Sequence, residues 1–413
     1  MKIFKGKAVS GGIVFGKLYF YNKDNPIEDD NAVLLSEQLP SPEEIEKLNK
    51  KPLAFCALKG SEHSHLAIAA QNSGIPIIIS LGHVSASECE NCIVDAYSGD
   101  LILSPDDNTA LSLKEKKDIT EKRRKELKSY IGKKSMTRSG KEIKVMSAIN
   151  RLADIKTCIA HDSEGIGLFR SEYLYIENSK YPSEELLFQT YKRLGERMGQ
   201  NPVTIRTIDL GSDKTAQYMN FVHEDNPALG CRGIRFCLKN PRILKVQLRA
   251  IFRSACFGNI RILLPMITSS KEIENVKLIM DEIAFELSVQ QISFKRPPLG
   301  AMIETPAAVL SSNEIANTAD FLSIGSNDLA QYTYATDRQS SALQQFIDAD
   351  ISPIMKLIEI TAKNGKENNK SVGICGFIAE NINLAESLIA MGINEFSVSP
   401  EYTLPLREKI CEC

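Results

Sequence analysis

The sequence lacks several features that mark whole classes of protein. It contains no apolar run long enough to cross a bilayer, and its first residues, MKIFKGKAVSGGIVFGK, lack the unbroken apolar core of a signal peptide. Neither sign of charge dominates, since 50 Lys and Arg residues stand against 52 Asp and Glu residues, for a formal net charge of −2. We therefore expect no membrane insertion, and no nucleic acid or anionic membrane bound by bulk charge.

The sequence also lacks a cysteine framework. Its ten cysteines are scattered. Cys89-x-x-Cys92 has no second pair and Cys411-x-Cys413 lies at the terminus, so we interpret neither as a metal site. Scattered cysteines are typical of reduced thiols, and we expect a cytoplasmic protein.

Residues 1–107 are predicted to form a small α/β domain. Its apolar segments are short and are separated by turns and short helical patterns. Six segments predict strands: GIVFGKLYFY, NAVLLSE, PLAFCAL, IPIIIS, NCIVDAY and DLILSP. Residues 108–135 are rich in Lys, Glu and Arg with few helix breakers, which predicts a solvent-exposed linker helix ending near Gly132.

Residues 136–413 show a regular alternation of buried-type strands and helical patterns. The strand segments are 142–150, 165–170, 203–210, 260–267, 299–304, 321–325, 371–376 and 395–400. Eight such strands alternating with helices predict a (β/α)8 barrel, a fold of typically ~250 residues. The gap between the third and fourth strands is the longest, and we expect an extra subdomain there.

Polar residues gather where these strands end, which is where barrels of this kind carry their chemistry. The arginines in question are Arg170, Arg206, Arg232 and Arg338. A single such arginine is usually a salt-bridge partner of a neighbouring helix. Several of them at one barrel mouth repel one another unless an anion lies between them, and guanidinium groups bind phosphate and carboxylate bidentately. The pattern favours a small substrate with two anionic groups.

Glu304 and Asp328 follow neighbouring predicted strands, and Asn327 directly precedes Asp328. Alone, each acid is expected to be structural, but together they suit Mg²⁺, which takes one or two carboxylates plus substrate oxygens and waters. Cys375 ends the seventh strand, flanked by glycines. Two interpretations of it stay open: a small buried hydrophobe, or a group that donates or accepts a proton.

Two histidines lie together in GSEHSHLAIAAQNSGIP, where a short helix is predicted to begin near His65. A histidine at a helix N-terminus faces unpaired N–H groups that stabilise a phosphoryl group on its ring. A metal pair with His63 is disfavoured because no third and fourth ligands are evident nearby. A packed core pair remains the default interpretation of any isolated histidine.

Eight motifs give the chain a resemblance to a known family: SHLAIAA…GIP, GIGLFRSEYLY, RTIDLGSDK, NPALGCRGIR, LLPMI, MIETPAAV, SIGSNDLAQYTYATDR and GICG. They run in family order over almost the whole chain. The chain resembles Enzyme I of the phosphoenolpyruvate-dependent sugar phosphotransferase system and, more broadly, the phosphoenolpyruvate-utilising enzymes.

The resemblance implies a role for each site residue. His65 would accept the phosphoryl group on a swivelling domain, and Cys375 would protonate the enolate to give pyruvate. The remaining residues would bind phosphoenolpyruvate (Arg170, Arg206, Arg232, Asn327 and Arg338) or Mg²⁺ (Glu304 and Asp328). The linker helix would let the swivelling domain carry phosphorylated His65 away from the barrel, and the barrel would form a homodimer.

The chain departs from the family in several places. The helical domain that docks the phosphocarrier protein HPr is absent near residues 24–31. The ATP-binding domain of phosphoenolpyruvate synthase and pyruvate phosphate dikinase is also absent, and no Gly-rich nucleotide loop replaces it. Four positions differ from the family. The family has Thr where this chain has His63, Arg where it has Gln71, Trp where it has Cys231 and Glu where it has Phe377.

Two hypotheses follow from the matches and the departures. The first is a phosphoenolpyruvate-protein phosphotransferase that phosphorylates itself on His65 and passes the group to an acceptor, such as a divergent HPr-like protein. The second is a non-catalytic sensor of phosphoenolpyruvate or pyruvate, or a regulatory paralogue of Enzyme I. We favour the enzyme, because a decayed site has no reason to keep His65, Cys375 and both carboxylates together.

Overall fold

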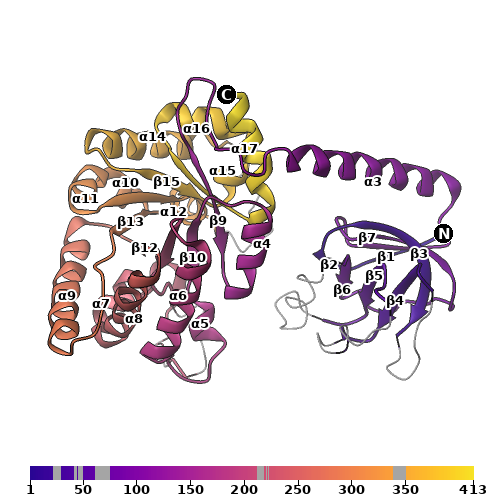
Figure 1. Cartoon of the computed structure of the whole chain (residues 1–413), viewed down its shortest axis with the longest axis horizontal. Helices are drawn as coiled ribbons and strands as arrows, with labels where there is room; N and C mark the ends of the chain where they lie inside the picture. The colour runs from indigo at the N-terminus through magenta and orange to yellow at the C-terminus, as the bar shows by residue number, and fades with distance from the viewer. Residues whose placement is uncertain are drawn as a thin grey trace. The chain divides into compact units, whose positions relative to one another are not determined.

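A computed structural model describes residues 1–21, 29–40, 44, 50–60, 75–211, 218–219, 221, 223–337 and 350–413. The chain forms two compact units, Met1–Glu126 and Leu127–Cys413 (Figure 1). Within the described ranges, no helix is both long and apolar enough to cross a membrane.

The first unit is built on one eight-stranded sheet, in the order β1-β8-β7-β3-β4-β5-β6-β2. The strands are β1 Lys2–Lys5, β2 Lys7–Ser10, β3 Ile13–Phe20, β4 Ala32–Ser36, β5 Ala54–Ala57, β6 Ile77–Ile79, β7 Asn91–Asp95 and β8 Asp100–Leu103. Six of the eight match the predicted segments. β1 and β2 are not predicted from the sequence, because lysines and Gly6 interrupt their apolar pattern and most of their side chains are exposed.

A single residue, Gly6, joins the two ends of this sheet. β1 pairs with β8 at one edge, and β2 pairs with β6 at the other. The chain therefore crosses from one edge strand to the other within one residue, so the sheet must wrap around on itself. At the crossing, Gly6 N donates to Gly99 O at 2.8 Å. A Cβ atom on Gly6 would lie 2.4 Å from Ile79 O, which leaves room only for glycine.

The sheet also shows why no docking domain fits near residues 24–31. β3 and β4 are parallel neighbours, with Phe20 opposite Leu35. Only residues 21–31 connect them, which is too short a stretch to fold as a further domain.

Helix α3 (Asp107–Lys128) follows the sheet and has no buried residue. Lys116 Nζ contacts Asp95 Oδ2 at 2.5 Å, and Asp95 also accepts from Tyr97 N at 3.0 Å, which ties the helix to the β7–β8 turn. The helix ends seven residues before the predicted limit of the linker. Residues 129–132 form turns, in which Gly132 has φ +77°.

The second unit is a closed barrel of eight parallel strands, as the sequence predicts (Figure 1). The strands are β9 Lys144–Ile149, β10 Ile166–Arg170, β11 Pro202–Arg206, β12 Asn259–Leu264, β13 Leu299–Ile303, β14 Phe321–Gly325, β15 Val372–Cys375 and β16 Glu395–Val398, and β16 pairs with β9 to close the ring.

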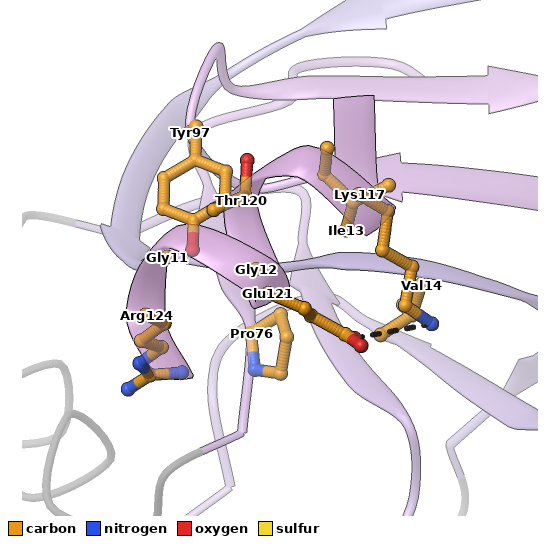
Figure 2. A pocket seen from close by; sticks show the side chains of 10 residues that line it. All are labelled: Gly11, Gly12, Ile13, Val14, Pro76, Tyr97, Lys117, Thr120, Glu121 and Arg124. Carbon is orange, nitrogen blue, oxygen red and sulfur yellow. Dashed lines mark ion pairs between the residues drawn. The ribbon is translucent and has the colours of Figure 1, made fainter. Parts of the chain in front are cut away.

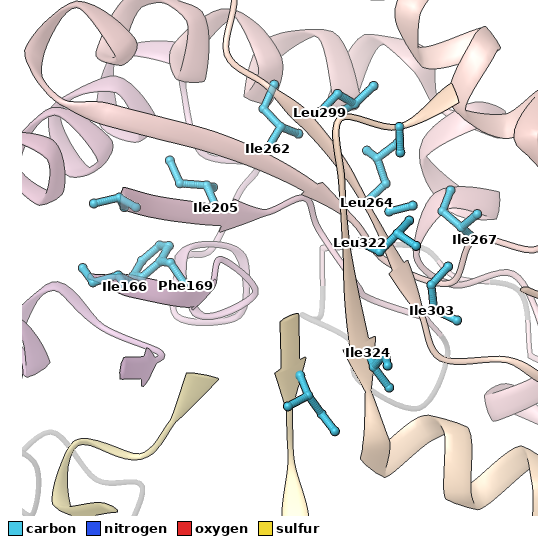
Figure 3. Close-up of a cluster of buried hydrophobic side chains, with 14 of the residues drawn as sticks. Ile166, Phe169, Ile205, Ile262, Leu264, Ile267, Leu299, Ile303, Leu322 and Ile324 are labelled. Carbon is cyan, nitrogen blue, oxygen red and sulfur yellow. The ribbon is translucent and has the colours of Figure 1, made fainter. Parts of the chain in front are cut away.

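Helices alternate with these strands and cover them. They include α4 Ile155–Ala160, α5 Tyr173–Ile176, α6 Glu184–Met198, α7 Ile234–Lys239, α8 Pro241–Ser254, α9 Ser270–Val289, α10 Pro306–Leu310, α11 Ser312–Thr318, α12 Ser326–Tyr334, α14 Ser352–Glu367, α15 Phe377–Glu380, α16 Ala385–Met391 and α17 Thr403–Glu412. The main core lies between strands and helices and holds side chains such as Phe169, Ile205 and Ile262 (Figure 3). The predicted insertion after β11 contains α7 and α8.

An ion pair fills the N-terminal half of the barrel interior. Arg261 of β12 donates to Glu395 Oε1 and Oε2 of β16 at 3.1 and 3.0 Å, and its Nε donates to Thr204 Oγ1 at 3.0 Å. Its guanidinium group also lies over the Phe321 ring, 4.7 Å from the centroid. This end of the barrel is therefore packed, which leaves the other end for chemistry.

A second buried arginine fixes the segment that leads into the barrel. Arg407 of α17 is fully buried; it donates to Tyr130 O at 3.0 Å and to Ser135 Oγ at 3.1 Å, and forms an ion pair with Asp162. Gly132 N donates to the same Asp162 carboxylate at 2.7 Å. Residues 130–135 are therefore fastened to the barrel by one guanidinium group and its carboxylate partner.

Candidate functional site

A cavity of about 350 Å³ opens at the C-terminal ends of the barrel strands. It brings together six of the predicted site residues: Arg170, Arg206, Glu304, Asn327, Asp328 and Cys375. Arg232 contacts this group, since its Nη1 donates to Asp328 Oδ1 at 3.2 Å. His65 and Arg338 lie outside the described residues.

Arg206 ends β11 and lies almost completely buried at the cavity. Its Nη2 donates to Glu172 Oε1 at 2.9 Å, and its Nη1 lies 3.3 Å from Asp209 Oδ2. Burial alone would lower its pKa, but these two carboxylates raise the pKa of Arg206 above its usual value, so it is always charged. Among the residues that the structure describes, its Nε has no hydrogen-bond partner.

Arg232 is held in a fork by one carboxylate. Its Nε and Nη2 donate to Asp209 Oδ1 and Oδ2 at 3.1 and 2.7 Å. Burial opposes its charge, but Asp209 and Asp328 outweigh burial and raise the pKa of Arg232. Arg232 therefore links the carboxylate beside Arg206 to a predicted metal ligand.

These contacts revise the expectation that converging arginines need a bound anion between them. In the structure, Asp209 lies between Arg206 and Arg232 and pairs with both, while Glu172 pairs with Arg206 and Asp328 pairs with Arg232. The clustering of arginines therefore does not by itself show an anionic substrate.

Two residues of the site were missed. Glu172 lines the cavity two residues after β10, and Asn150 directly follows β9 and accepts from Arg170 Nη1 at 3.2 Å. The strand-end rule that selected the arginines would also have selected both of these residues.

Glu304 follows β13 and is fully buried, with Oε1 accepting from Met266 N at 2.6 Å. Burial, reinforced by the negative charges of Asp328 and Asp209, raises the pKa of Glu304 to about 8. Burial and the neighbouring carboxylates both disfavour the ionised form of Glu304, and a divalent cation at this place would offset both effects.

The donors suit Mg²⁺ better than an ion that needs an all-protein cage. Glu304 and Asp328 offer hard oxygens at neighbouring strand ends. No group of three or more His, Cys, Asp or Glu in the described ranges is arranged to hold a metal. Magnesium fits such a site, since it is often held by one or two carboxylates together with substrate oxygens and waters.

Asn327 and Asp328 lie in the first turn of α12, directly after β14. Asn327 Oδ1 accepts from Phe377 N at 3.0 Å, which ties α12 to the loop after β15. The intervening Gly376 has φ +88°, and a Cβ atom there would lie 2.6 Å from Asn327 Oδ1. Glycine is therefore required for this close approach.

Cys375 ends β15, and its surroundings leave both interpretations of it open. It packs with Leu168, Leu263, Met302 and Phe321 in a small apolar cluster, and it lines the cavity. Burial raises the pKa of Cys375 to about 11, while Arg170 acts in the opposite direction. The thiol therefore keeps its proton at neutral pH, as a proton donor must.

A second cavity, of about 180 Å³, lies in the first unit and is lined by α3 and the sheet (Figure 2). None of the predicted site residues lines it. Lys117 and Glu121 on its helical side form an ion pair at 3.9 Å. The barrel cavity is therefore the better candidate for catalysis.

Comparisons with known proteins match both parts of the chain. Residues 124–413 match the PEP-binding domain of PEP-utilising enzymes, and residues 28–99 match their mobile domain. A phosphoenolpyruvate-protein phosphotransferase of Mycoplasma pneumoniae is 35% identical over 90% of this chain and 65% of its own length. That of Buchnera aphidicola subsp. Schizaphis graminum is 34% identical over 92% of this chain and 67% of its own length. That of Priestia megaterium is 31% identical over 96% of this chain and 70% of its own length.

The chain thus spans about two thirds of the length of these relatives. Two solved structures also match parts of it. For aconitase X of Thermococcus kodakaraensis, the match covers 25% of this chain and 100% of that protein at 19% identity. For RipC of Yersinia pestis, it covers 57% of this chain and 85% of that protein at 12% identity. Their TM-scores of 0.21 and 0.34 are too low to support an argument. On the domain matches and the curated relatives, the chain belongs to the family of PEP-utilising enzymes.

Proposed function

We propose that the chain transfers the phosphoryl group of phosphoenolpyruvate to His65 and releases pyruvate. The observation that carries the proposal is the cavity that Arg170 and Arg206 both line, beside the carboxylates of Glu304 and Asp328. Among the described residues, Arg170 donates to the neutral Asn150 and forms no ion pair with a carboxylate, so its charge can bind an anion in the cavity. The relatives' name and the matched PEP-binding domain support phosphoenolpyruvate as that anion.

In the proposed reaction, Arg170, Arg206, Arg232 and Arg338 bind and orient the phosphate and carboxylate groups, and Asn327 contacts the phosphate. The His65 ring nitrogen attacks phosphorus, and the bond from phosphorus to the enol oxygen breaks. Mg²⁺ held by Glu304 and Asp328 would neutralise charge on the phosphate oxygens. Cys375 then gives its proton to the methylene carbon of the enolate, which forms pyruvate, and solvent returns a proton to the thiolate.

The assignment of domains belongs to the same proposal. Residues 1–107 are the swivelling phosphohistidine domain, 108–135 the linker and 136–413 the barrel that binds phosphoenolpyruvate. The family match of residues 28–99 to a mobile domain supports the first of these. We place the protein in the cytoplasm and expect a homodimer through the barrel, by analogy with the family.

The acceptor of the phosphoryl group is proposed to be an HPr-like phosphocarrier protein. Because residues 21–31 leave no room for a docking domain, the carrier must be recognised elsewhere on this chain or through a separate chain. Mixing phosphorylated protein with candidate carriers and measuring phosphate uptake by each carrier tests this step.

The first prediction concerns His65. After incubation with phosphoenolpyruvate and Mg²⁺, intact mass spectrometry is expected to show one added phosphoryl group on the wild-type protein and none on His65→Ala. His63→Ala is the matched control and is expected to accept the group. A wild-type protein that binds phosphoenolpyruvate but stays unmodified would show that the chain is a sensor or a regulatory paralogue instead.

The second prediction concerns pH. Because Mg²⁺ binds the ionised carboxylate and the pKa of Glu304 is raised to about 8, Mg²⁺ affinity is expected to rise between pH 6.5 and 8.5. Competition with one proton makes the rise about tenfold per pH unit below that pKa. Calorimetric titration with Mg²⁺ measures it. Glu177→Gln, which changes a surface glutamate paired with Arg151, should keep the slope, whereas Glu304→Gln should lose both slope and affinity. A flat profile in the wild-type protein would remove Glu304 from the metal site.

A further inference from the structure

Gln247 lies on α8, outside the barrel cavity, and its side chain is fully buried. Its amide donates to Ser171 Oγ at 2.9 Å and to Tyr191 OH at 3.1 Å, and its Oε1 accepts from Ile208 N at 3.0 Å. Burying a primary amide is unfavourable unless its groups are bonded, and here both the N–H₂ and the carbonyl oxygen have partners.

The partners of Gln247 belong to the two loops that carry the site. Ser171 stands between Arg170 and Glu172, directly after β10, and Ile208 precedes Asp209, shortly after β11. Ser171 Oγ also donates to Arg206 O at 2.7 Å, so the contact reaches the backbone of the buried arginine.

On the cavity side, the same two loops meet again through a carboxylate. Glu172 Oε1 accepts from Arg206 Nη2 at 2.9 Å and from Asp209 N at 3.0 Å. The two loops are thus bonded to each other at the cavity and held from behind by one amide of α8.

We infer that Gln247 is a positioning residue for phosphoenolpyruvate binding, because it sets the spacing between the loop of Arg170 and the loop of Arg206. The inference rests on the proposed function. Gln247 touches no substrate; it acts through Ser171 and Ile208. Loss of such supporting partners in comparable sites typically costs about 10- to 100-fold in affinity or activity, since small displacements of binding groups are expensive.

The test uses variants of the full chain that also carry His65→Ala. That change blocks phosphoryl transfer, so calorimetry measures the affinity for phosphoenolpyruvate at equilibrium. Gln247→Met keeps side-chain length without hydrogen bonds and is expected to weaken affinity about tenfold or more. Two controls are expected to stay within about threefold: Leu248→Ala, which removes a buried neighbour on α8, and Tyr191→Phe, which removes only the bond to α6.

A second readout does not need the substrate. Hydrogen exchange at the Ile208 and Asp209 amides is expected to speed up in Gln247→Met more than in Leu248→Ala at equal loss of thermal stability. If Gln247→Met does not fold, Ser171→Ala takes its place, since it removes the hydroxyl between the amide and Arg206 O.

The possible results distinguish the positioning role of Gln247 from the proposed function. If the parent protein binds phosphoenolpyruvate and Gln247→Met binds it as tightly as Leu248→Ala does, the positioning role is wrong and the proposed function stands. If the parent protein binds no phosphoenolpyruvate, both are overturned.

Discussion

Replacing Arg206 by methionine is expected to weaken phosphoenolpyruvate binding by about 10- to 100-fold. A hydrogen bond to a charged group contributes about 1.5–3 kcal/mol, which corresponds to about one to two powers of ten in affinity. Arg206 lines the cavity, where its guanidinium group can offer one such bond to a substrate anion. Calorimetric titration with phosphoenolpyruvate, in protein that carries His65→Ala, measures the change.

Arg261→Met is the matched control for this experiment. It also removes a largely buried arginine of the barrel interior, but from the N-terminal half, where Arg261 pairs with Glu395. It is expected to lower stability while leaving phosphoenolpyruvate affinity within about threefold, since Arg261 does not line the cavity and, among the described residues, shares no hydrogen-bond or ion-pair partner with Arg206. Equal losses of affinity in Arg206→Met and Arg261→Met would mean that general destabilisation, and not a lost contact, explains the effect.

Replacing Arg407 by methionine is expected to destabilise the barrel unit by about 2–3 kcal/mol. A hydrogen bond to a charged group contributes about 1.5–3 kcal/mol, and the Asp162 side chain is 36% exposed, so solvent would stabilise its charge once Arg407 is lost. The Tyr130 carbonyl, the Ser135 hydroxyl and the Asp162 carboxylate would all lose a charged donor at once. Because the chain has two units, overall unfolding is not a two-state transition. Hydrogen exchange of barrel-strand peptides along a urea series reports the barrel alone.

Lys363→Met is the control for Arg407→Met. Lys363 and Glu367 form an exposed pair at 4.0 Å on α14, and such pairs contribute about 0–1 kcal/mol. A loss in Arg407→Met no larger than that in Lys363→Met would refute the anchoring of residues 130–135 by Arg407.

The barrel was predictable because its signal is local and repeated. Each strand, such as 260–267 for β12, is a run of buried apolar residues, and the rule that chemistry lies at strand ends then placed Arg206, Glu304 and Asp328 around one cavity. The sequence could not show which anion each arginine faces. Asp209 comes from the loop after β11, and only the folded chain places it between Arg206 and Arg232.

The end of the linker helix escaped prediction for a similar reason. No helix breaker follows Lys128 before Gly132, so the sequence alone predicts more helix than forms. The fully buried Arg407 lies 277 residues after Tyr130 in the sequence. It donates to the backbone carbonyl of Tyr130 and fixes the turns that follow the helix. Such a long-range contact overrides local helix propensity.

The crossing at Gly6 has a consequence for the order in which the first unit assembles. β1 and β2 are synthesised before all of their partners, since β1 pairs with residues 100–103 and β2 with residues 77–79. At about 5–20 residues per second, the first strand waits on the order of 5–20 s on the ribosome before residue 103 appears. During that time Lys2, Lys5 and Lys7, which all stay exposed in the folded unit, keep the waiting strands charged and discourage edge-to-edge pairing with other nascent chains. The lysines that interrupt the apolar pattern of β1 and β2 are therefore suited to prevent wrong strand pairing before the sheet is complete.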